Sequence, residues 1–367
     1  MIRRKACFVC TTPYQIIESI AIVEELKLDS DLYIYGTFDG YENVANKLKY
    51  SKIFVSVITI DYNKYHSISL ARTFWESLNY KHISSKILPQ NVSYDYFYTS
   101  TRSHTNLILL YELVRRNTQM YYVYFEDGIG TYEKNMMYLV QSKGRKYTEL
   151  LLGINSLKPQ KTIIMAMFPK MLEIPDVLKG AKIFQQPRLN FSGGFNELVG
   201  CIFSLKPYKS PLKKIIVFDT FRVERNLNTI EIKMMDVCLK EIEKLLPTNS
   251  FMYKPHPRSG ILPDINSDIE KLDGTPAELF FTQIKDLDNC VFIGNLSTSL
   301  FSPKLLFNKE PIIISLHKIV IPYAKNWFSM FDKVQSLYKH KDRMIAPNTL
   351  SEFQKICNYI KNNIDAD

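Results

Sequence analysis

The chain has 367 residues, of which 46% are hydrophobic and 23% charged, and its formal net charge is +10. These values are typical of a soluble globular protein with two domains, and they exclude an intrinsically disordered chain. A membrane-spanning helix needs an apolar run of about 18 residues, which the sequence lacks, so we expect a cytoplasmic protein. The positive charge favours an anionic partner. Because the basic residues are dispersed and no nucleic-acid-binding motif is present, we expect a phosphorylated ligand or an acidic membrane face, and no nucleic acid.

In the first half of the chain, strand-like runs alternate with helix-like runs. Helical spacing of apolar residues is found at 14–28 and 106–116. Buried strands are predicted by five apolar runs: 6–10, 32–35, 53–60, 96–99 and 120–125. Such alternation predicts a parallel, doubly wound α/β sheet.

A second alternating series follows a polar stretch that is rich in glycine and proline. It predicts strands at 214–218, 251–253, 291–293 and 311–315, and a helix at 229–246. We therefore expect two Rossmann-like domains that face each other across a cleft. The predicted parts are an acceptor-side domain at 1–190, a linker at 191–211, a nucleotide-sugar-binding domain at 212–345 and a C-terminal segment at 346–367. That segment contains an amphipathic helix at 350–364, and one arrangement we consider is that this helix packs back on the first domain.

The first candidate motif is Glu126-Asp127-Gly128, which directly follows the run at 120–125. Ligands of open α/β sheets bind at the carboxyl edge of the strands, which is where this motif is expected. Repulsion between the two carboxylates can raise the pKa of one of them, so that it serves as a general base. The alternative is a loop whose carboxylates cap the next turn. Asp219, at the end of the 214–218 strand, is a rival carboxylate.

The second motif is Lys254-Pro255-His256-Pro257-Arg258, which follows the run at 251–253. The two prolines fix the backbone around the imidazole. Three basic groups within five residues suit a phosphate, and His256 could donate a proton to a leaving oxygen. A carboxylate from the first half and this histidine would form a base and acid pair.

Two further motifs lie at predicted helix starts. Gly294-Asn295-Leu296-Ser297-Thr298-Ser299 follows a strand, and its hydroxyl and N–H groups suit an anion, although a simple Ser/Thr N-cap is the alternative. Thr275-Pro276-Ala277-Glu278 has the pattern of a capping box, but Glu278 could instead bind ribose hydroxyls.

Other sequence features argue against a bound cofactor or metal. The first strand-to-helix turn, at 10–15, lacks the glycines of a dinucleotide-binding loop. Asp29-Ser30-Asp31 is interpreted as a cap at the amino edge of the sheet. We expect neither a cofactor nor a catalytic metal.

Together these motifs resemble those of a known family. The turn Cys10-Thr11-Thr12-Pro13-Tyr14-Gln15, the acidic motif, Lys254-Pro255-His256-Pro257 and Ser297-Thr298-Ser299 are similar to motifs of bacterial sialyltransferases that act on lipooligosaccharide and capsular polysaccharide. The motifs occur in the family's order from near residue 10 to near residue 300. The resemblance implies a GT-B fold and an inverting, metal-independent transfer of sialic acid from CMP-sialic acid to a terminal galactose.

The resemblance also implies roles for individual residues. Glu126 or Asp127 would be the base, with Glu126 the first candidate, and His256 would assist departure of the CMP phosphate. The donor would be bound by Lys254, Pro257, Glu278, Gly294, Asn295, Ser297, Thr298 and Ser299. The cleft would be lined from the first domain by Thr11, Thr12, Pro13, Gln15 and Gly128.

Two alternatives stay open at this point. The same fold could use a UDP-hexose donor, because the family also contains hexose transferases. A non-enzymatic basic protein that binds a membrane or nucleic acid is the second alternative. The partners we expect are a nucleotide-sugar donor and a glycan acceptor, and the Tyr- and Phe-rich composition leaves a homodimer or peripheral membrane association open.

Overall fold

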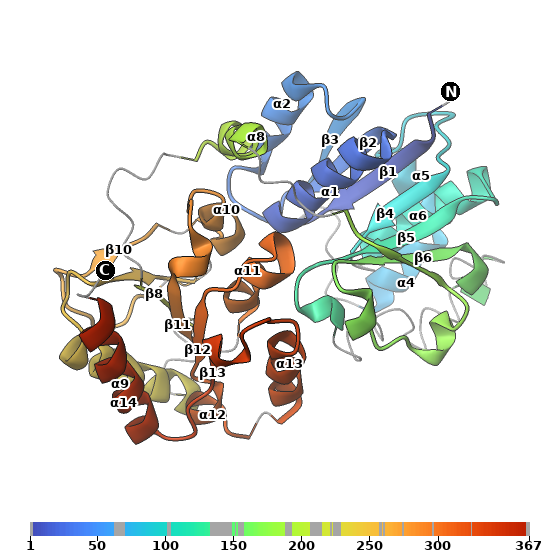
Figure 1. The fold of residues 1–367 in the computed structure, drawn as a ribbon. Helices are drawn as coiled ribbons and strands as arrows, with labels where there is room; N and C mark the ends of the chain where they lie inside the picture. Colours follow the sequence, from blue (N-terminus) through green and yellow to red (C-terminus); the bar gives the residue numbers. More distant parts are fainter. Residues whose placement is uncertain are drawn as a thin grey trace. The chain divides into compact units, whose positions relative to one another are not determined.

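A computed structural model gives the structure of the chain. It describes residues 3–61, 70–100, 104–132, 149–150, 152, 158–187, 193–205, 215–220, 222, 229–256, 259, 261–273, 275–295, 297–323 and 325–364. The chain divides into two compact units, Met1–Leu205 and Lys206–Asp367. Each unit contains a sheet of parallel strands with helices packed on it (Figure 1).

The sheet of the first unit has seven strands in the order β3-β2-β1-β4-β5-β6-β7. Along the chain these are β1 (Lys5–Cys10), β2 (Asp29–Tyr35), β3 (Ser56–Ile60), β4 (Tyr96–Thr99), β5 (Tyr121–Phe125), β6 (Thr162–Ala166) and β7 (Lys182–Gln185). The helices are α1 (Pro13–Leu26), α2 (Tyr41–Ser51), α4 (Leu70–Leu78), α5 (Tyr80–Ser84), α6 (His104–Arg116) and α8 (Gly193–Phe203). Every strand pair is parallel, as the alternation of strands and helices predicts.

The second unit repeats the same strand order with six strands, β10-β9-β8-β11-β12-β13. The strands are β8 (Ile215–Phe218), β9 (Phe251–Lys254), β10 (Glu270–Lys271), β11 (Val291–Gly294), β12 (Ile312–Ser315) and β13 (Met344–Ile345). The helices are α9 (Ile230–Leu245), α10 (Ala277–Phe281), α11 (Thr298–Phe307), α12 (His317–Val320), α13 (Lys325–Gln335) and α14 (Leu350–Ile364). In both units the sequence order reverses between the first and fourth strands, and such a switch point is where ligands of doubly wound sheets bind.

Apolar side chains on both faces of each sheet explain why the strands are buried. In the second unit, one face packs against α9, α12 and α14 through residues such as Met235, Val320 and Phe353. The opposite face carries a cluster of aromatic rings, in which Phe281 of α10 contacts Phe218 and Phe292. Two doubly wound α/β units are therefore confirmed. Of the helices among the described residues, none is long and apolar enough to cross a membrane.

Two features differ from the expected ones. The stretch expected to be linker contains α8, which belongs to the first unit, where Lys47 of α2 donates a hydrogen bond to the carbonyl of Cys201 (2.6 Å). The remainder of that stretch, 206–211, lies outside the described residues. Asp29-Ser30-Asp31 is not a cap but the start of β2, where Asp31 accepts hydrogen bonds from the hydroxyls of Ser56 and Tyr94.

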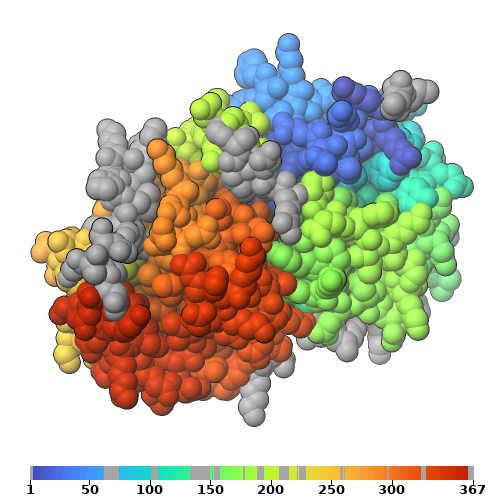
Figure 2. Space-filling view, in the orientation of Figure 1, coloured from blue at the N-terminus to red at the C-terminus, as the bar shows by residue number. Residues whose placement is uncertain are grey.

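The C-terminal helix α14 begins and ends at the residues expected for it. Its apolar face packs on α9 of the second unit, and Gln354 donates a hydrogen bond to Glu241 of α9 (2.8 Å). The expected return of this helix onto the first domain stays a prediction. In the space-filling view, the orange and red residues of the second unit form one continuous surface (Figure 2).

Candidate active site

The carboxyl edge of the first sheet gathers the predicted residues of the first half of the chain. Thr11 to Gln15 follow β1, at the switch point between β1 and β4, and Glu126 to Gly128 follow β5. Thr12 is the N-cap of α1 and accepts a hydrogen bond from the N–H of Gln15 (3.3 Å), while Pro13 occupies the first helical position. Both residues therefore have a structural role in starting α1.

Glu126 is completely enclosed by hydrogen-bond donors of its own unit. Its carboxylate accepts hydrogen bonds from the hydroxyls of Tyr14 (3.3 Å) and Tyr132 and from the N–H of Met167 (2.7 Å). None of its surface is exposed, and burial raises its pKa to about 7 although the three donors favour the charged form. A carboxylate with both oxygens occupied in this way is held firmly and is shielded from solvent.

A second buried acid, Glu18 of α1, lies behind Glu126. Its carboxylate accepts a hydrogen bond from the side-chain amide of Gln186 (2.5 Å), whose oxygen accepts from the N–H of Glu126 (2.9 Å). Burial, and then the charge of Glu126, raise the pKa of Glu18 well above its usual value. The sequence analysis missed Glu18, although its signal is present: a lone acid within the apolar stretch 16–23.

Asp127 differs from its neighbour because it is half-buried, with part of its surface exposed. Its N–H donates a hydrogen bond to the hydroxyl of Thr131 (2.8 Å). Burial raises the pKa of Asp127, while the adjacent amide of Gln15 acts in the opposite direction. That amide is oriented by Thr11, whose N–H and hydroxyl both donate to its oxygen (2.6 and 3.1 Å). Of the two acids, Asp127 is therefore the more accessible one at this edge.

Gly128 has a backbone requirement that explains its place in the motif. Its φ angle is +72°, in the left-handed region that glycine adopts at no steric cost. It turns the chain into the short 3-10 helix Gly130–Tyr132, which carries both Thr131 and Tyr132. Gly128 thus helps to place the partners of the two acids.

In the second unit, Asp219 follows β8 and is held in a buried ion pair. The Arg222 guanidinium donates to its carboxylate through Nε (2.5 Å) and Nη2 (3.0 Å), and the hydroxyl of Tyr253 donates to it as well. Arg222 is itself fully buried and also pairs with Asp236 (2.7 Å). These contacts make Asp219 an internal ion-pair partner and weaken its case as a rival base.

Lys254, which was expected to bind the donor, has its ammonium directed elsewhere. It is 2% exposed and donates hydrogen bonds to the carbonyls of Asp273 (2.9 Å) and Thr275. Burial lowers its pKa to about 8. The sequence pattern gave no sign of this orientation, because strand-end position alone does not fix the direction of a lysine side chain.

His256 lies two residues beyond β9 and is half-buried. Its carbonyl accepts a hydrogen bond from the N–H of Ser259 (2.9 Å), and the hydroxyl of Ser259 accepts from the N–H of Arg222 (2.9 Å). The backbone that carries the imidazole is therefore tied to the buried ion pair. Neither Arg222 nor Ser259 was singled out from the sequence. Pro257 and Arg258 lie outside the described residues.

The motif after β11 lies at the switch point between β8 and β11. Gly294 is required by close packing, because a Cβ atom there would lie 3.0 Å from the carbonyl oxygen of Phe218. Asn295 is buried and its amide donates to Glu231 of α9 (3.0 Å). Ser297 is the N-cap of α11, accepting from the N–H of Ser299 (3.1 Å), which confirms the capping interpretation for this residue.

Thr298 and Ser299 form the first turn of α11 and are both half-exposed. Next to this turn, Ser302 donates hydrogen bonds to the carbonyl of Thr298 (3.0 Å) and to the carboxylate of Glu278 (3.4 Å). Ser302 thus brings Glu278 of α10 beside the start of α11. The turn offers two hydroxyls at a helix start, an arrangement that suits a phosphate, and the N–H groups of Ser299 and Leu300 already donate to Ser297 (3.1 Å each).

The expected capping box at 275–278 is not formed. Helix α10 begins at Ala277, its N-cap residue is Pro276, and no side chain caps it. Glu278 is half-buried, and its carboxylate accepts a hydrogen bond from Ser302 (3.4 Å). The ribose-binding alternative for Glu278 stays a prediction.

Two groups of predicted residues thus exist, one in each unit. Thr11, Gln15 and Asp127 lie at the carboxyl edge of the first sheet, with Glu126 behind them. Lys254, Glu278, Thr298 and Ser299 lie at the carboxyl edge of the second. Among the described residues, no group of three His, Cys, Asp or Glu side chains is arranged to hold a metal ion.

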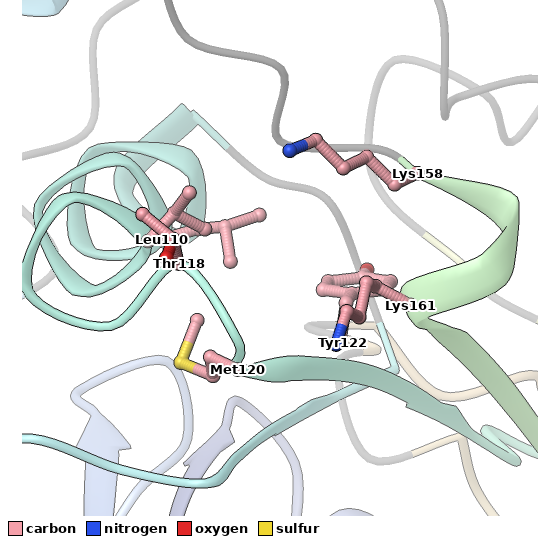
Figure 3. A pocket seen from close by; sticks show the side chains of 7 residues that line it. Leu110, Thr118, Met120, Tyr122, Lys158 and Lys161 are labelled. Carbon is pink, nitrogen blue, oxygen red and sulfur yellow. The ribbon is translucent and has the colours of Figure 1, made fainter.

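A shallow pocket in the first unit contains none of these residues (Figure 3). It lies at the amino ends of β5 and β6, where Met120, Tyr122 and Lys161 line it together with Leu110 and Lys158. The pocket is therefore at the opposite edge of the sheet from Glu126 and Asp127.

No family model matches the sequence, and a search of curated proteins gives no match. Solved structures do show similarity. The glycotransferase of kitacinnamycin is 10% identical with a TM-score of 0.51, covering 100% of this chain and 92% of that one. TcCGT1, solved in complex with UDP, is 9% identical with a TM-score of 0.50, covering 99% of this chain and 90% of that one. At these identities the similarity is one of fold, and the chain has a GT-B-like fold of two Rossmann-like domains.

Proposed function

We propose that the protein is a glycosyltransferase with a nucleotide-sugar donor. The observation that carries the proposal is the grouping of Glu278 with the first turn of α11 at the switch point of the second sheet. A carboxylate suits the two hydroxyls of a ribose, and a helix start with hydroxyl side chains suits the phosphate next to it. The GT-B-like fold agrees with this use of the second unit.

The reaction we propose is a single displacement with inversion, without a metal ion. Asp127 removes the proton of the acceptor hydroxyl, whose oxygen then forms the new bond to the anomeric carbon of the sugar. The bond from that carbon to the phosphate oxygen breaks, and the nucleotide leaves with a proton donated by His256. The partial exposure of Asp127 and the complete burial of Glu126 support Asp127 as the base and reverse the ranking expected from the sequence.

Two donors are candidates. The motif resemblance supports CMP-sialic acid, with a terminal galactose of a bacterial surface glycan as acceptor. The complex of TcCGT1 with UDP supports a UDP-hexose instead. Both donors present a ribose and a phosphate to the same side chains, so the geometry of Glu278, Thr298 and Ser299 serves either one.

Nucleotide release with each donor tests the proposal. Purified full-length protein is incubated with CMP-sialic acid, UDP-glucose, UDP-galactose or UDP-N-acetylglucosamine and a galactose-terminated oligosaccharide. We expect one donor class to release CMP or UDP in step with glycan formation, and His256→Ala to lower the rate at least about tenfold. Equal rates for wild type and His256→Ala would overturn the role of His256, and no transfer from any donor would overturn the proposed activity.

A further inference from the structure

Lys254 links the end of β9 to the segment that precedes α10, both at the carboxyl edge of the second sheet. It is the last residue of β9, two residues before His256, and its ammonium donates to the carbonyls of Asp273 and Thr275 in the segment between β10 and α10. Lys254 as a whole is 2% exposed, so these carbonyls and not solvent are the partners of its ammonium. The lysine therefore ties the end of β9 to the start of α10.

Two further hydrogen bonds hold the segment that Lys254 contacts. Leu272 donates its N–H to the carbonyl of Tyr253 (2.9 Å), and the N–H of Thr275 donates to the carboxylate of Asp273 (2.9 Å). Glu278 follows only three residues after Thr275, on a five-residue helix that no side chain caps. The anchoring of the preceding segment thus sets the position of Glu278 together with the packing of α10 and the hydrogen bond from Ser302.

The charges around Lys254 agree with a holding role. Burial lowers its pKa to about 8, and the carboxylates of Asp273 and Glu278 act in the opposite direction. The ring of Phe280, with its centre 6.0 Å from the ammonium, lies on α10 as well. At neutral pH the ammonium stays charged, and its hydrogen bonds to the two carbonyls are charge-assisted.

We infer that Lys254 is a positioning residue, which sets the affinity for the nucleoside part of the donor by fixing Glu278. This inference rests on the proposed function, and it differs from the phosphate contact that the basic motif suggested. A lysine that bound phosphate would act only on ligands that carry phosphate. A lysine that positions Glu278 acts on the ribose, and so on nucleosides and nucleotides alike.

Calorimetric titration with matched ligands separates the two roles. Wild type, Lys254→Met and the control Lys271→Met, which changes an exposed lysine of β10, are titrated with cytidine and CMP and with uridine and UDP. We expect Lys254→Met to lower the affinity for nucleoside and for nucleotide by the same factor, about tenfold. Lys271→Met should change neither affinity by more than about twofold. A loss confined to CMP or UDP, or no loss at all, would overturn the inference.

A double-mutant cycle with Glu278→Gln adds a second readout. If Lys254 acts through Glu278, the double variant loses less affinity than the product of the two single losses. Losses that multiply would contradict the inference.

Asp273→Ala covers the case in which Lys254→Met does not fold. It removes the acceptor of the Thr275 N–H from the same segment without changing Lys254. This variant should lower the affinity for nucleoside and for nucleotide equally, and unchanged binding would count against the inference. If the wild type binds none of the four ligands, the proposed function itself is wrong.

Discussion

Glu126 and Asp127 are neighbours in sequence but differ in accessibility. Three donors and complete burial surround Glu126, whereas Asp127 is half-buried beside the Gln15 amide. Burial raises the pKa values of both groups, and a general base must reach the acceptor hydroxyl, so the difference in exposure decides between them. We therefore expect Glu126 to stabilise the edge and Asp127 to act as the base.

Substitution of each acid tests this division. We expect Asp127→Asn to lower kcat about 10²- to 10⁴-fold, since the variant cannot accept the proton, with nucleotide affinity unchanged. Glu126→Gln keeps the shape of the side chain and should retain at least about a tenth of the wild-type kcat. Steady-state kinetics with saturating donor measure both values, and the reverse order of losses would restore Glu126 as the base.

The raised pKa of Glu126 also predicts how stability depends on pH. The folded chain keeps a proton on Glu126 up to about pH 7, whereas the unfolded chain releases it near 4.5. The proton on Glu126 therefore contributes its full stabilisation below pH 4.5, and this stabilisation is lost as the pH rises through 7. The loss lowers the free energy of unfolding by about 3 kcal/mol.

Urea unfolding of the wild type and of Glu126→Gln between pH 5 and 8 measures this contribution. The wild type should lose stability over that range relative to the variant, which has no titrating group at this position. Parallel pH profiles for the two proteins would show that Glu126 does not titrate between these limits.

Strand ends were the most predictable elements of this chain. The carboxyl ends of β1, β5, β9 and β11 follow from apolar runs that stop at polar residues, and each was predicted within one residue. The strands β6, β7, β10 and β13 were missed. The run Thr162–Ala166 is too short to distinguish a strand from a buried helix by periodicity, and all four residues of Lys182–Gln185 are exposed.

The candidate site was only partly predictable, for a physical reason. Sequence order places Lys254, Asp219 and Glu126 at strand ends, but it does not show where their side chains point. Each is engaged with partners that are distant in sequence or unremarkable in it, such as Thr275, Arg222 and Met167. A buried strand that ends at polar residues therefore predicts that a polar cluster forms there. It does not predict which residue of the cluster contacts the ligand.

The contact between β11 and β8 gives a prediction about one glycine. Gly294→Ala would place a Cβ atom 3.0 Å from the carbonyl oxygen of Phe218 and 3.1 Å from its Cβ. Because two adjacent strands must separate to relieve this contact, we expect a loss of about 1–3 kcal/mol in urea unfolding.

Gly200→Ala is the matched control. Gly200 lies within α8, where an added Cβ meets nothing within 4 Å, so the same substitution should be neutral or stabilising by up to about 1 kcal/mol. A Gly294→Ala variant as stable as the wild type would mean that the strand ends are not packed as described.

Considered as a whole, the molecule repeats one strand order in two units without a repeat in its sequence. Counted within its own unit, each sheet has its strands in the order 3-2-1-4-5-6, and the first sheet adds a seventh strand at the end. Each sheet therefore has a switch point between its first and fourth strands. The polar residues of both candidate motifs follow the strands beside these two points. The same topology thus supplies an acidic edge in the first unit and an edge suited to ribose and phosphate in the second.

A crystal structure of the full chain with CMP or UDP is the most direct test of this account. We predict the ribose beside Glu278 and the phosphate at the first turn of α11, against Thr298 and Ser299. A nucleotide bound in the pocket lined by Tyr122 and Lys161, or anywhere else away from the carboxyl edge of the second sheet, would contradict it.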